Sequence, residues 1–270
     1  MFEPVAAGAT NRSMAPSVQR AALVDLDPDL ARFVPEGRWA GARADIPVRV
    51  VTLERGPWPF HGLNANATHL GILIVAGILG RELLAHDTAS MELLGPGDVV
   101  RPWDESADSE LLKAVVRWSA LSDMRLAILD RHVAVRLAHY PEIHAALLER
   151  CALRARRLAV MQTISQLNRV DRRLLALFWH LAERWGRVSA DGVVLPLALS
   201  HRVLGQLVGA RRPSVSTALA ELSRSGEVVR GMAGTWILTG RPVGAPEPRA
   251  SPAIVPRRPM LPRSSHVLPV

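Results

Sequence analysis

The hydrophobic pattern of the chain changes near Asp130, and this change limits what each part can fold into. Upstream, short apolar or alternating runs are separated by glycine and aspartate turns. These runs are residues 48–53, 71–76, 78–84, 90–94, 114–118 and 124–129. Repeated short strands with turns about every ten residues are typical of an antiparallel sandwich or roll. Gly56, Gly77 and Gly97 fall where such strands must turn. We therefore expect an all-β domain over residues 21–130.

Downstream of Asp130 the pattern is helical. Residues 131–168 contain no glycine, and their single proline, Pro141, suits the first turn of a helix. We expect a short helix ending near His139, a long helix over about 141–168, and a third over 172–185 that ends at Gly186. Apolar residues of the long helix recur at spacings of three, four and seven: Leu147, Cys151, Leu153, Leu158, Val160, Met161, Ile164 and Leu167. So broad a stripe can cover the β domain and also a second copy of the chain. Residues 131–169 are thus predicted to dimerise, although a helix that only caps its own domain is an alternative.

Residues 170–240 contain two helices joined by a tight turn. Ser200 can cap the first helix, Gly205 permits close approach of the second, and Gly209 supplies a left-handed turn. Pro213 falls in the first turn of the second helix. The expected buried positions are Leu204, Leu207 and Val208 on the first helix and Val215, Ala218, Leu219 and Leu222 on the second. Two apolar runs, 227–230 and 235–238, follow as a β-hairpin wing, so this region is predicted to be a winged helix-turn-helix.

The polar residues of this region suit a DNA groove. Arginine can bridge the O6 and N7 atoms of guanine, small hydroxyls can reach bases or phosphates, and a helix N-terminus attracts phosphate. The start of the first helix would meet the flanking backbone. The predicted DNA-binding residues are Ser200, His201, Arg202, Arg211, Arg212, Ser214, Ser216 and Thr217. The net charge of +8, nearly all from arginine, also indicates a polyanionic partner, unless an arginine-rich proteome and a basic tail explain it.

From about Ala22 to Gly240, and most strongly over Leu199–Leu222, the chain resembles the Crp/Fnr family of transcription regulators. The stretches Ile72–Gly77 and Leu94–Asp98 resemble the family's β-roll. The resemblance implies an α+β fold: an N-terminal antiparallel β-roll like a cyclic-nucleotide-binding domain, a long dimerisation helix and a C-terminal winged helix-turn-helix. It also implies a homodimer that binds double-stranded DNA at a palindromic site. RNA polymerase and an unidentified small-molecule effector are further candidate partners.

By the same resemblance, Arg212 stands where these proteins place their main guanine-reading arginine. Arg211, Ser214 and Thr217 stand where neighbouring base or phosphate contacts arise. Pro213 departs from the family's frequent glutamate, so the half-site can differ from the usual one.

The effector is not expected to be a cyclic nucleotide. Family members that bind one carry a Gly-Glu pair and an Arg-Ser or Arg-Thr pair after the glycine-aspartate turn. Residues 101–113 contain neither pair, Leu112 and Lys113 fall about where the arginine pair belongs, and the acidic loop would repel a phosphate. The lone Cys151 excludes an iron–sulfur cluster or a thiolate-rich zinc site from one chain. We expect no cofactor, with haem held by one or two histidines as the alternative: His61, His69, His86, His132, His139 and His144.

Other features support the same interpretation. Residues 1–20 and 241–270 are predicted to be disordered tails, the latter rich in proline and arginine. No apolar run approaches the roughly 20 residues of a membrane span, and a single cysteine fits a reducing bacterial cytoplasm. We find no phosphate loop, nucleophile elbow or metal-ligand histidine pair, so an enzyme is not expected. The second hypothesis is a protein-interaction module with a structural β-roll.

Overall fold

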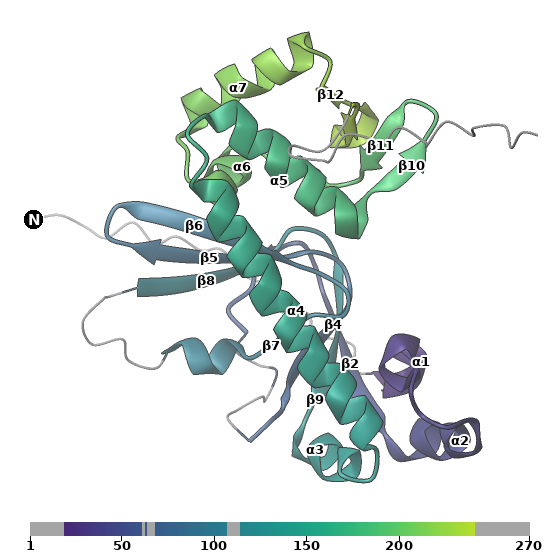
Figure 1. Cartoon of the computed structure of the whole chain (residues 1–270). Helices are drawn as coiled ribbons and strands as arrows, with labels where there is room; N and C mark the ends of the chain where they lie inside the picture. Colours follow the sequence, from purple (N-terminus) through teal and green to yellow (C-terminus); the bar gives the residue numbers. More distant parts are fainter. Residues whose placement is uncertain (1–18, 61–62, 64–67, 107–113, 241–270) are drawn as a thin grey trace, which may run out of the picture.

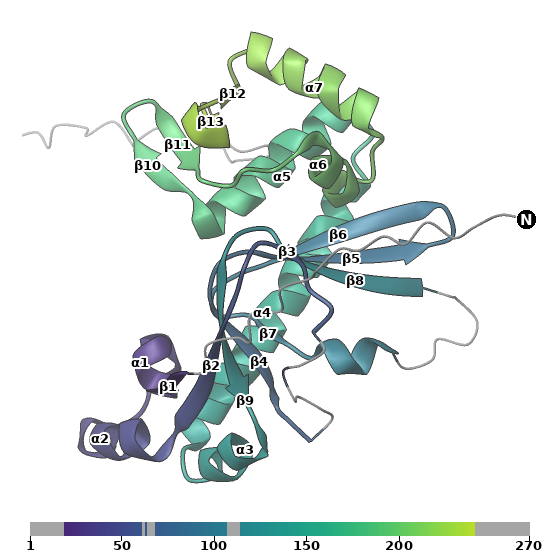
Figure 2. The same ribbon diagram turned by 180° about the vertical axis from the view of Figure 1, so that it is seen from behind.

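The computed structural model describes residues 19–60, 63, 68–106 and 114–240, and the predicted tails fall almost entirely outside these residues. The described chain forms a β-roll, a long helix that runs beside the roll, and a C-terminal helical domain with a small sheet (Figure 1). Figure 2 shows the same arrangement from behind, with the helical domain at one end of the long helix and helices α1 to α3 at the other.

The roll consists of two antiparallel sheets. The first has the order β1-β2-β9-β4-β7 and the second the order β3-β8-β5-β6. The strands of the first sheet are β1 (Gln19–Ala22), β2 (Pro47–Leu53), β9 (Met124–Leu129), β4 (Gly71–Ala76) and β7 (Val99–Val100). The strands of the second sheet are β3 (Gly56–Pro57), β8 (Ala114–Ala120), β5 (Leu79–Ala85) and β6 (Thr88–Leu94). Every predicted strand is present, because alternating apolar residues face the interior between the sheets.

The interior of the roll is filled by aliphatic side chains and a pair of tryptophans. The rings of Trp58 and Trp118 meet edge to face, with centroids 6.2 Å apart. Gly77 has a φ of +93°, and a Cβ there would lie 2.4 Å from the carbonyl oxygen of Asp123, so this turn requires glycine.

The expectation of an all-β domain was wrong at residues 23–45, which are helical. They form α1 (Leu23–Leu26), a 3₁₀ turn (Pro28–Ala31) and α2 (Glu36–Asp45). Only Ala42 of α2 is buried, so this helix carries no apolar stripe that a sequence pattern could reveal. The hydroxyl of Tyr140 donates to Asp45 at 2.6 Å and attaches α2 to the start of the long helix.

The helices after the roll begin where the sequence predicts. Asp130 caps α3 (Arg131–Leu137) by accepting hydrogen bonds from the backbone N–H groups of His132 and Val133 at 2.9 and 3.0 Å. Pro141 starts the long helix α4 (Pro141–Ser165) in its first turn. One side of α4 packs on the roll through Ile143, Ala146 and Leu147.

The C-terminal domain is a helical core covered on one side by a sheet of order β10-β11-β13-β12. Its elements are α5 (Val170–Trp185), β10 (Arg187–Ser189), β11 (Gly192–Leu195), α6 (His201–Val208), α7 (Arg212–Arg224), β12 (Val228–Arg230) and β13 (Trp236–Leu238). Phe178, Leu204, Val215 and Trp236 meet in its core. The predicted wing is β12 and β13, whereas the hairpin of β10 and β11 was not predicted. No helix of the described residues is both long and apolar enough to cross a membrane.

Candidate nucleic-acid interface

Helices α6 and α7 form the predicted helix-turn-helix. The side chain of Ser200 caps α6 by accepting from the backbone N–H of Val203 at 3.3 Å. Gly209 ends α6 in a left-handed conformation with a φ of +64°. A Cβ on Gly205 would lie 2.5 Å from the carbonyl oxygen of Ala210, so this glycine lets the turn fold back on α6. Pro213 lies in the first turn of α7, and all seven predicted apolar positions of the two helices are buried.

The eight predicted DNA-binding residues lie at the start of α6 and in the first half of α7. His201 is half-buried and the other seven are exposed. The Nδ1 atom of His201 lies 2.9 Å from Oγ of Ser216, which joins the start of α6 to α7. The hydroxyls of Ser216 and Thr217 also donate to the backbone carbonyls of Arg212 and Pro213, at 3.1 and 3.3 Å. These bonds orient two side chains on the outer face of α7.

The arginines of this face differ in their surroundings. Within the described residues, the guanidinium groups of Arg211 and Arg212 have no hydrogen-bond or ion-pair partner. Arg202 instead lies 3.3 Å from a carboxylate of the roll, Glu82. Two exposed, uncompensated guanidinium groups at a helix N-terminus make a site for an anion.

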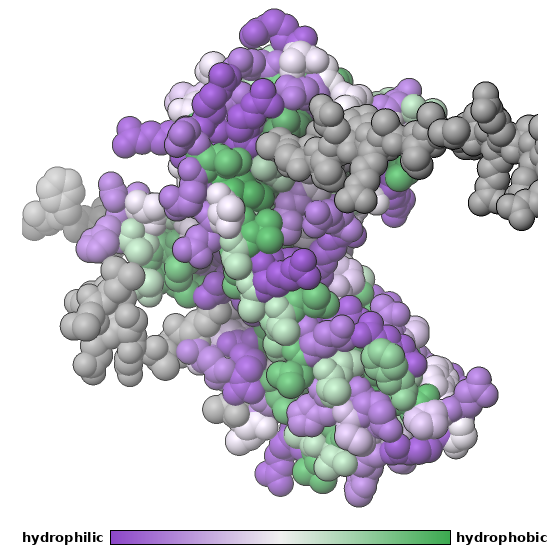
Figure 3. All heavy atoms as spheres, viewed as in Figure 1, coloured by the Kyte–Doolittle hydropathy of each residue, from purple (hydrophilic) through white to green (hydrophobic). Residues whose placement is uncertain are grey.

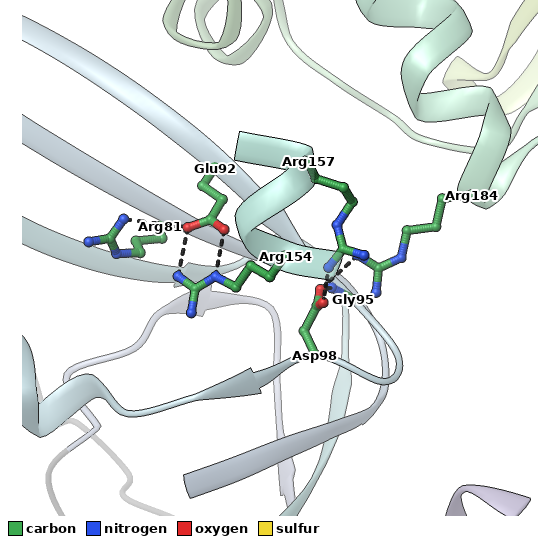
Figure 4. Close-up of polar contacts among 7 residues, drawn as sticks. All are labelled: Arg81, Glu92, Gly95, Asp98, Arg154, Arg157 and Arg184. Atoms are coloured by element: carbon green, nitrogen blue, oxygen red, sulfur yellow. Dashed lines mark hydrogen bonds and ion pairs between the residues drawn. The ribbon is translucent and has the colours of Figure 1, made fainter. Parts of the chain in front are cut away.

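Two carboxylates of the roll hold α4 and α5 in place (Figure 4). Glu92 on β6 accepts from Nε and Nη2 of Arg154 on α4, at 2.7 and 2.8 Å. Asp98, in the turn after β6, accepts from the backbone N–H of Gly95 at 2.9 Å and from Nη1 of Arg184 on α5 at 2.7 Å. The sequence pattern indicates Asp98 only as part of a turn, and it does not single out Arg154 and Arg184.

A third arginine, Arg157 on α4, also donates to Asp98. Burial lowers the pKa of Arg157 from its ordinary value, and the nearby Asp98 carboxylate opposes that shift. Asp98 therefore joins the roll, the long helix and the first helix of the C-terminal domain. Together with the contacts between β6 and α6, this joint holds the helix-turn-helix against the roll.

Residues 101–113, where the sequence lacks the pairs that bind a cyclic nucleotide in the resembled family, lie only partly within the described residues. Their first half forms a 3₁₀ turn over Pro102–Ser106, whereas residues 107–113 lie outside. Nη1 of Arg101 donates to the backbone carbonyls of His69 and Leu70 at 2.6 and 3.1 Å, so Arg101 is occupied within the roll. Among the described residues, no three histidine, cysteine, aspartate or glutamate side chains are placed to hold a metal ion, and His61 lies outside them.

Comparisons with known proteins agree with this arrangement. Residues 168–239 match the family model of a Crp-like helix-turn-helix domain. A cyclic nucleotide-binding domain containing protein from Listeria monocytogenes has a TM-score of 0.56 at 18% identity, over 70% of this chain and 88% of that one. FixK2 from Bradyrhizobium japonicum has a TM-score of 0.54 at 18% identity, over 72% and 93%.

A mutant of CooA from Carboxydothermus hydrogenoformans likewise has a TM-score of 0.54 at 16% identity, over 72% of this chain and 84% of that one. No curated protein matches the sequence. Structural likeness at such low identity establishes the fold alone. Residues 168–239 are therefore a Crp-like helix-turn-helix domain, and about 70% of the chain shares the fold of these three solved structures.

Proposed function

We propose that the protein is a sequence-specific transcription regulator of the bacterial cytoplasm, not an enzyme, that binds a palindromic DNA site as a homodimer. The observation that carries this proposal is the pair of exposed, uncompensated arginines, Arg211 and Arg212, at the N-terminus of α7. The opposite side of α7 is fixed in the core by Val215, Leu219 and Leu222. A helix held in this way can enter a major groove with its N-terminal end.

The residues around α7 divide into two groups by their placement. Arg212 would read guanine through O6 and N7, with Arg211, Ser214, Ser216 and Thr217 beside it. Ser200, His201 and Arg202, at the start of α6, would contact the flanking phosphates. The bond between His201 and Ser216 links the two groups, so phosphate contacts would also fix the position of α7 in the groove.

The second copy would pair along the outer side of α4. Figure 3, which has the same view as Figure 1, shows apolar side chains along this side of α4. Leu148 is 69% exposed, and Leu153, Leu158 and Val160 are 36% to 40% exposed. An apolar stripe on the side of α4 away from the roll is the expected signature of a helix pair. Pairing there would set two α7 helices about 34 Å apart, one turn of DNA.

The roll would bind an effector other than a cyclic nucleotide, or serve as a structural element. The packing of Trp58 against Trp118 supports this view because these rings fill space between the sheets. A signal from the roll would reach the helix-turn-helix through Asp98 and through the contacts of β6 with α6. RNA polymerase is the natural partner of a regulator bound at a promoter.

Selection of bound duplexes from a random pool by the full-length protein tests this function. We expect an enriched palindrome whose half-sites are about one helical turn apart, and binding that weakens steeply with salt as counterions are released. A shallow salt dependence would favour an interaction module instead. A monomer that enriches no sequence at low ionic strength would overturn the proposal.

A further inference from the structure

The β5–β6 hairpin of the roll lies beside α6. Figures 1 and 2, which view the molecule from opposite sides, both show the hairpin next to that helix. Glu82 on β5 accepts hydrogen bonds from the side-chain amide of Gln206 and, at 3.3 Å, from Nη2 of Arg202. The side chain of Glu82 is only 12% exposed, whereas that of Arg202 is 73% exposed. The bond to Gln206 is therefore the better shielded of the two.

The tip of this hairpin faces the turn between α6 and α7. Asp87, Thr88 and Ala89 form one wall of a cleft of about 350 Å³. The other wall includes Arg202, Arg211 and Arg212. A major groove about 12 Å wide is bordered by phosphates on both sides, so a duplex docked on these arginines needs far more space than the cleft offers. A duplex that docks on these arginines would therefore meet the tip.

The charges on the hairpin resemble those of the expected ligand. Glu82 lies beside one arginine of the DNA-binding face, and Asp87 lies across the cleft from two others. Phosphates would seek the same guanidinium groups. A carboxylate of the hairpin and a phosphate of DNA would therefore compete for the same arginines. The two groups carry charge of the same sign, and both need the space beside the guanidinium groups.

We propose that the β5–β6 hairpin is an intramolecular competitor of DNA. It flanks the exposed N-terminal end of α7 in the free protein and withdraws before a duplex docks. This inference rests on the proposed DNA-binding function. Since only the open fraction binds, the apparent dissociation constant equals that of the open form divided by the open fraction.

Two variants of the full-length protein separate the charge and the bulk of the hairpin. Glu82→Gln removes the charge beside Arg202 while keeping the side chain's size. The second variant replaces residues 84–89 with Asn-Gly; Leu83 and Ser90 already pair across the strands and form the same type of pair as Ala85 and Thr88, so a two-residue turn preserves the register. The control is Glu36→Gln, which removes the same charge from an exposed site on α2.

Fluorescence anisotropy with the selected duplex measures the dissociation constant of each variant. We expect it to fall about threefold for Glu82→Gln and about tenfold for the trimmed hairpin. The control should match the wild type, and circular dichroism and gel filtration establish that each variant is folded and of native size. In the wild type, DNA should also increase hydrogen exchange at the hairpin tip.

The outcomes are distinguishable from failure of the proposed function. If the wild type binds no duplex, the function itself is wrong. If the wild type binds, but the folded hairpin variants bind equally or more weakly, the hairpin does not compete with DNA. Weaker binding by both hairpin variants would instead show that the hairpin holds the helix-turn-helix in the orientation that binds DNA.

Discussion

Arg184 on α5 reaches out of the C-terminal domain to the roll, where its Nη1 atom lies 2.7 Å from Oδ2 of Asp98. The Asp98 side chain is only 2% exposed, and it also accepts from Arg157 and from the backbone of Gly95. One carboxylate thus holds three parts of the chain together. Such a group is costly to disturb, because its partners are left without compensation.

Asp98→Asn should destabilise the protein. The amide cannot accept from two guanidinium groups and Gly95 as the carboxylate does, and Arg157 and Arg184 would lose their counter-charge. We expect the free energy of unfolding in urea to fall by about 3 kcal/mol. The control Asp191→Asn removes an exposed charge in the β10–β11 turn and should change it by less than about 0.5 kcal/mol. A stable Asp98→Asn protein would show that the joint contributes little.

Gly205 and Gly209 serve different physical needs, which substitutions can separate. Gly205→Ala places a Cβ against the carbonyl oxygen of Ala210 and should cost about 1–3 kcal/mol. Gly209→Ala meets no atom within 4 Å but strains a φ of +64°, at a cost of about 1 kcal/mol. Asparagine tolerates that conformation, so Gly209→Asn should recover part of the loss, whereas Gly205→Asn should not. Equal effects of asparagine at both positions in urea unfolding would contradict this distinction.

The strands and helices could be predicted where burial imposes a period on the sequence. The strands of the roll and helices α4 to α7 each bury one face, so apolar residues recur at fixed spacings. Helix α2 has one buried residue and β10 has none, so neither segment shows apolar residues at regular spacings. This is why residues 23–45 were assigned to the β domain and the β10–β11 hairpin was missed.

The DNA-binding residues could be predicted because they are local. Ser200 to Thr217 form one short motif whose glycines and proline fix its geometry. The side-chain partners of Glu82 and Asp98 lie 59 to 124 positions away in the sequence. The sequence position of a charged side chain does not show which distant residue it pairs with. These pairs are therefore seen only in the folded structure.

Arg212 and Arg202 should differ in the kind of binding that they support. Arg212→Ala should cost about 1–3 kcal/mol on the selected duplex and relax the base preference at one position of each half-site. Arg202→Ala should weaken binding to all sequences alike and reduce the salt slope by about one. Repeating the selection and the salt titration with each variant checks both expectations. An unchanged footprint and affinity for Arg212→Ala would refute its assignment as the guanine reader.

Cys151 can report how two copies pair. It is the only cysteine, it is exposed, and it lies on α4 among the apolar residues of the proposed dimer face. In a parallel pair of α4 helices, equivalent positions of the two copies lie near each other across the symmetry axis. A short thiol-specific bifunctional reagent should therefore link the subunits, and Cys151→Ser should abolish the product. Leu148→Arg should weaken both cross-linking and dimerisation in analytical ultracentrifugation, whereas unaltered cross-linking would place the interface elsewhere.

His180 should make stability depend on pH in one direction. Its side chain, on α5, is 12% exposed. Burial lowers its pKa below the ordinary 6.5, as does Arg157 on α4, while Glu183 opposes the shift. The unfolded chain therefore binds this proton at a higher pH than the folded protein. The stabilisation from neutral His180 is complete above about pH 6.5 and declines as pH falls toward the folded pKa.

Urea unfolding between about pH 5 and pH 8 should show a smaller decline for His180→Gln than for the wild type. His144→Gln, which changes an exposed histidine on α4, serves as the control. A wild type that becomes more stable on acidification relative to His180→Gln would reverse the sign and show that the folded protein favours the charged ring.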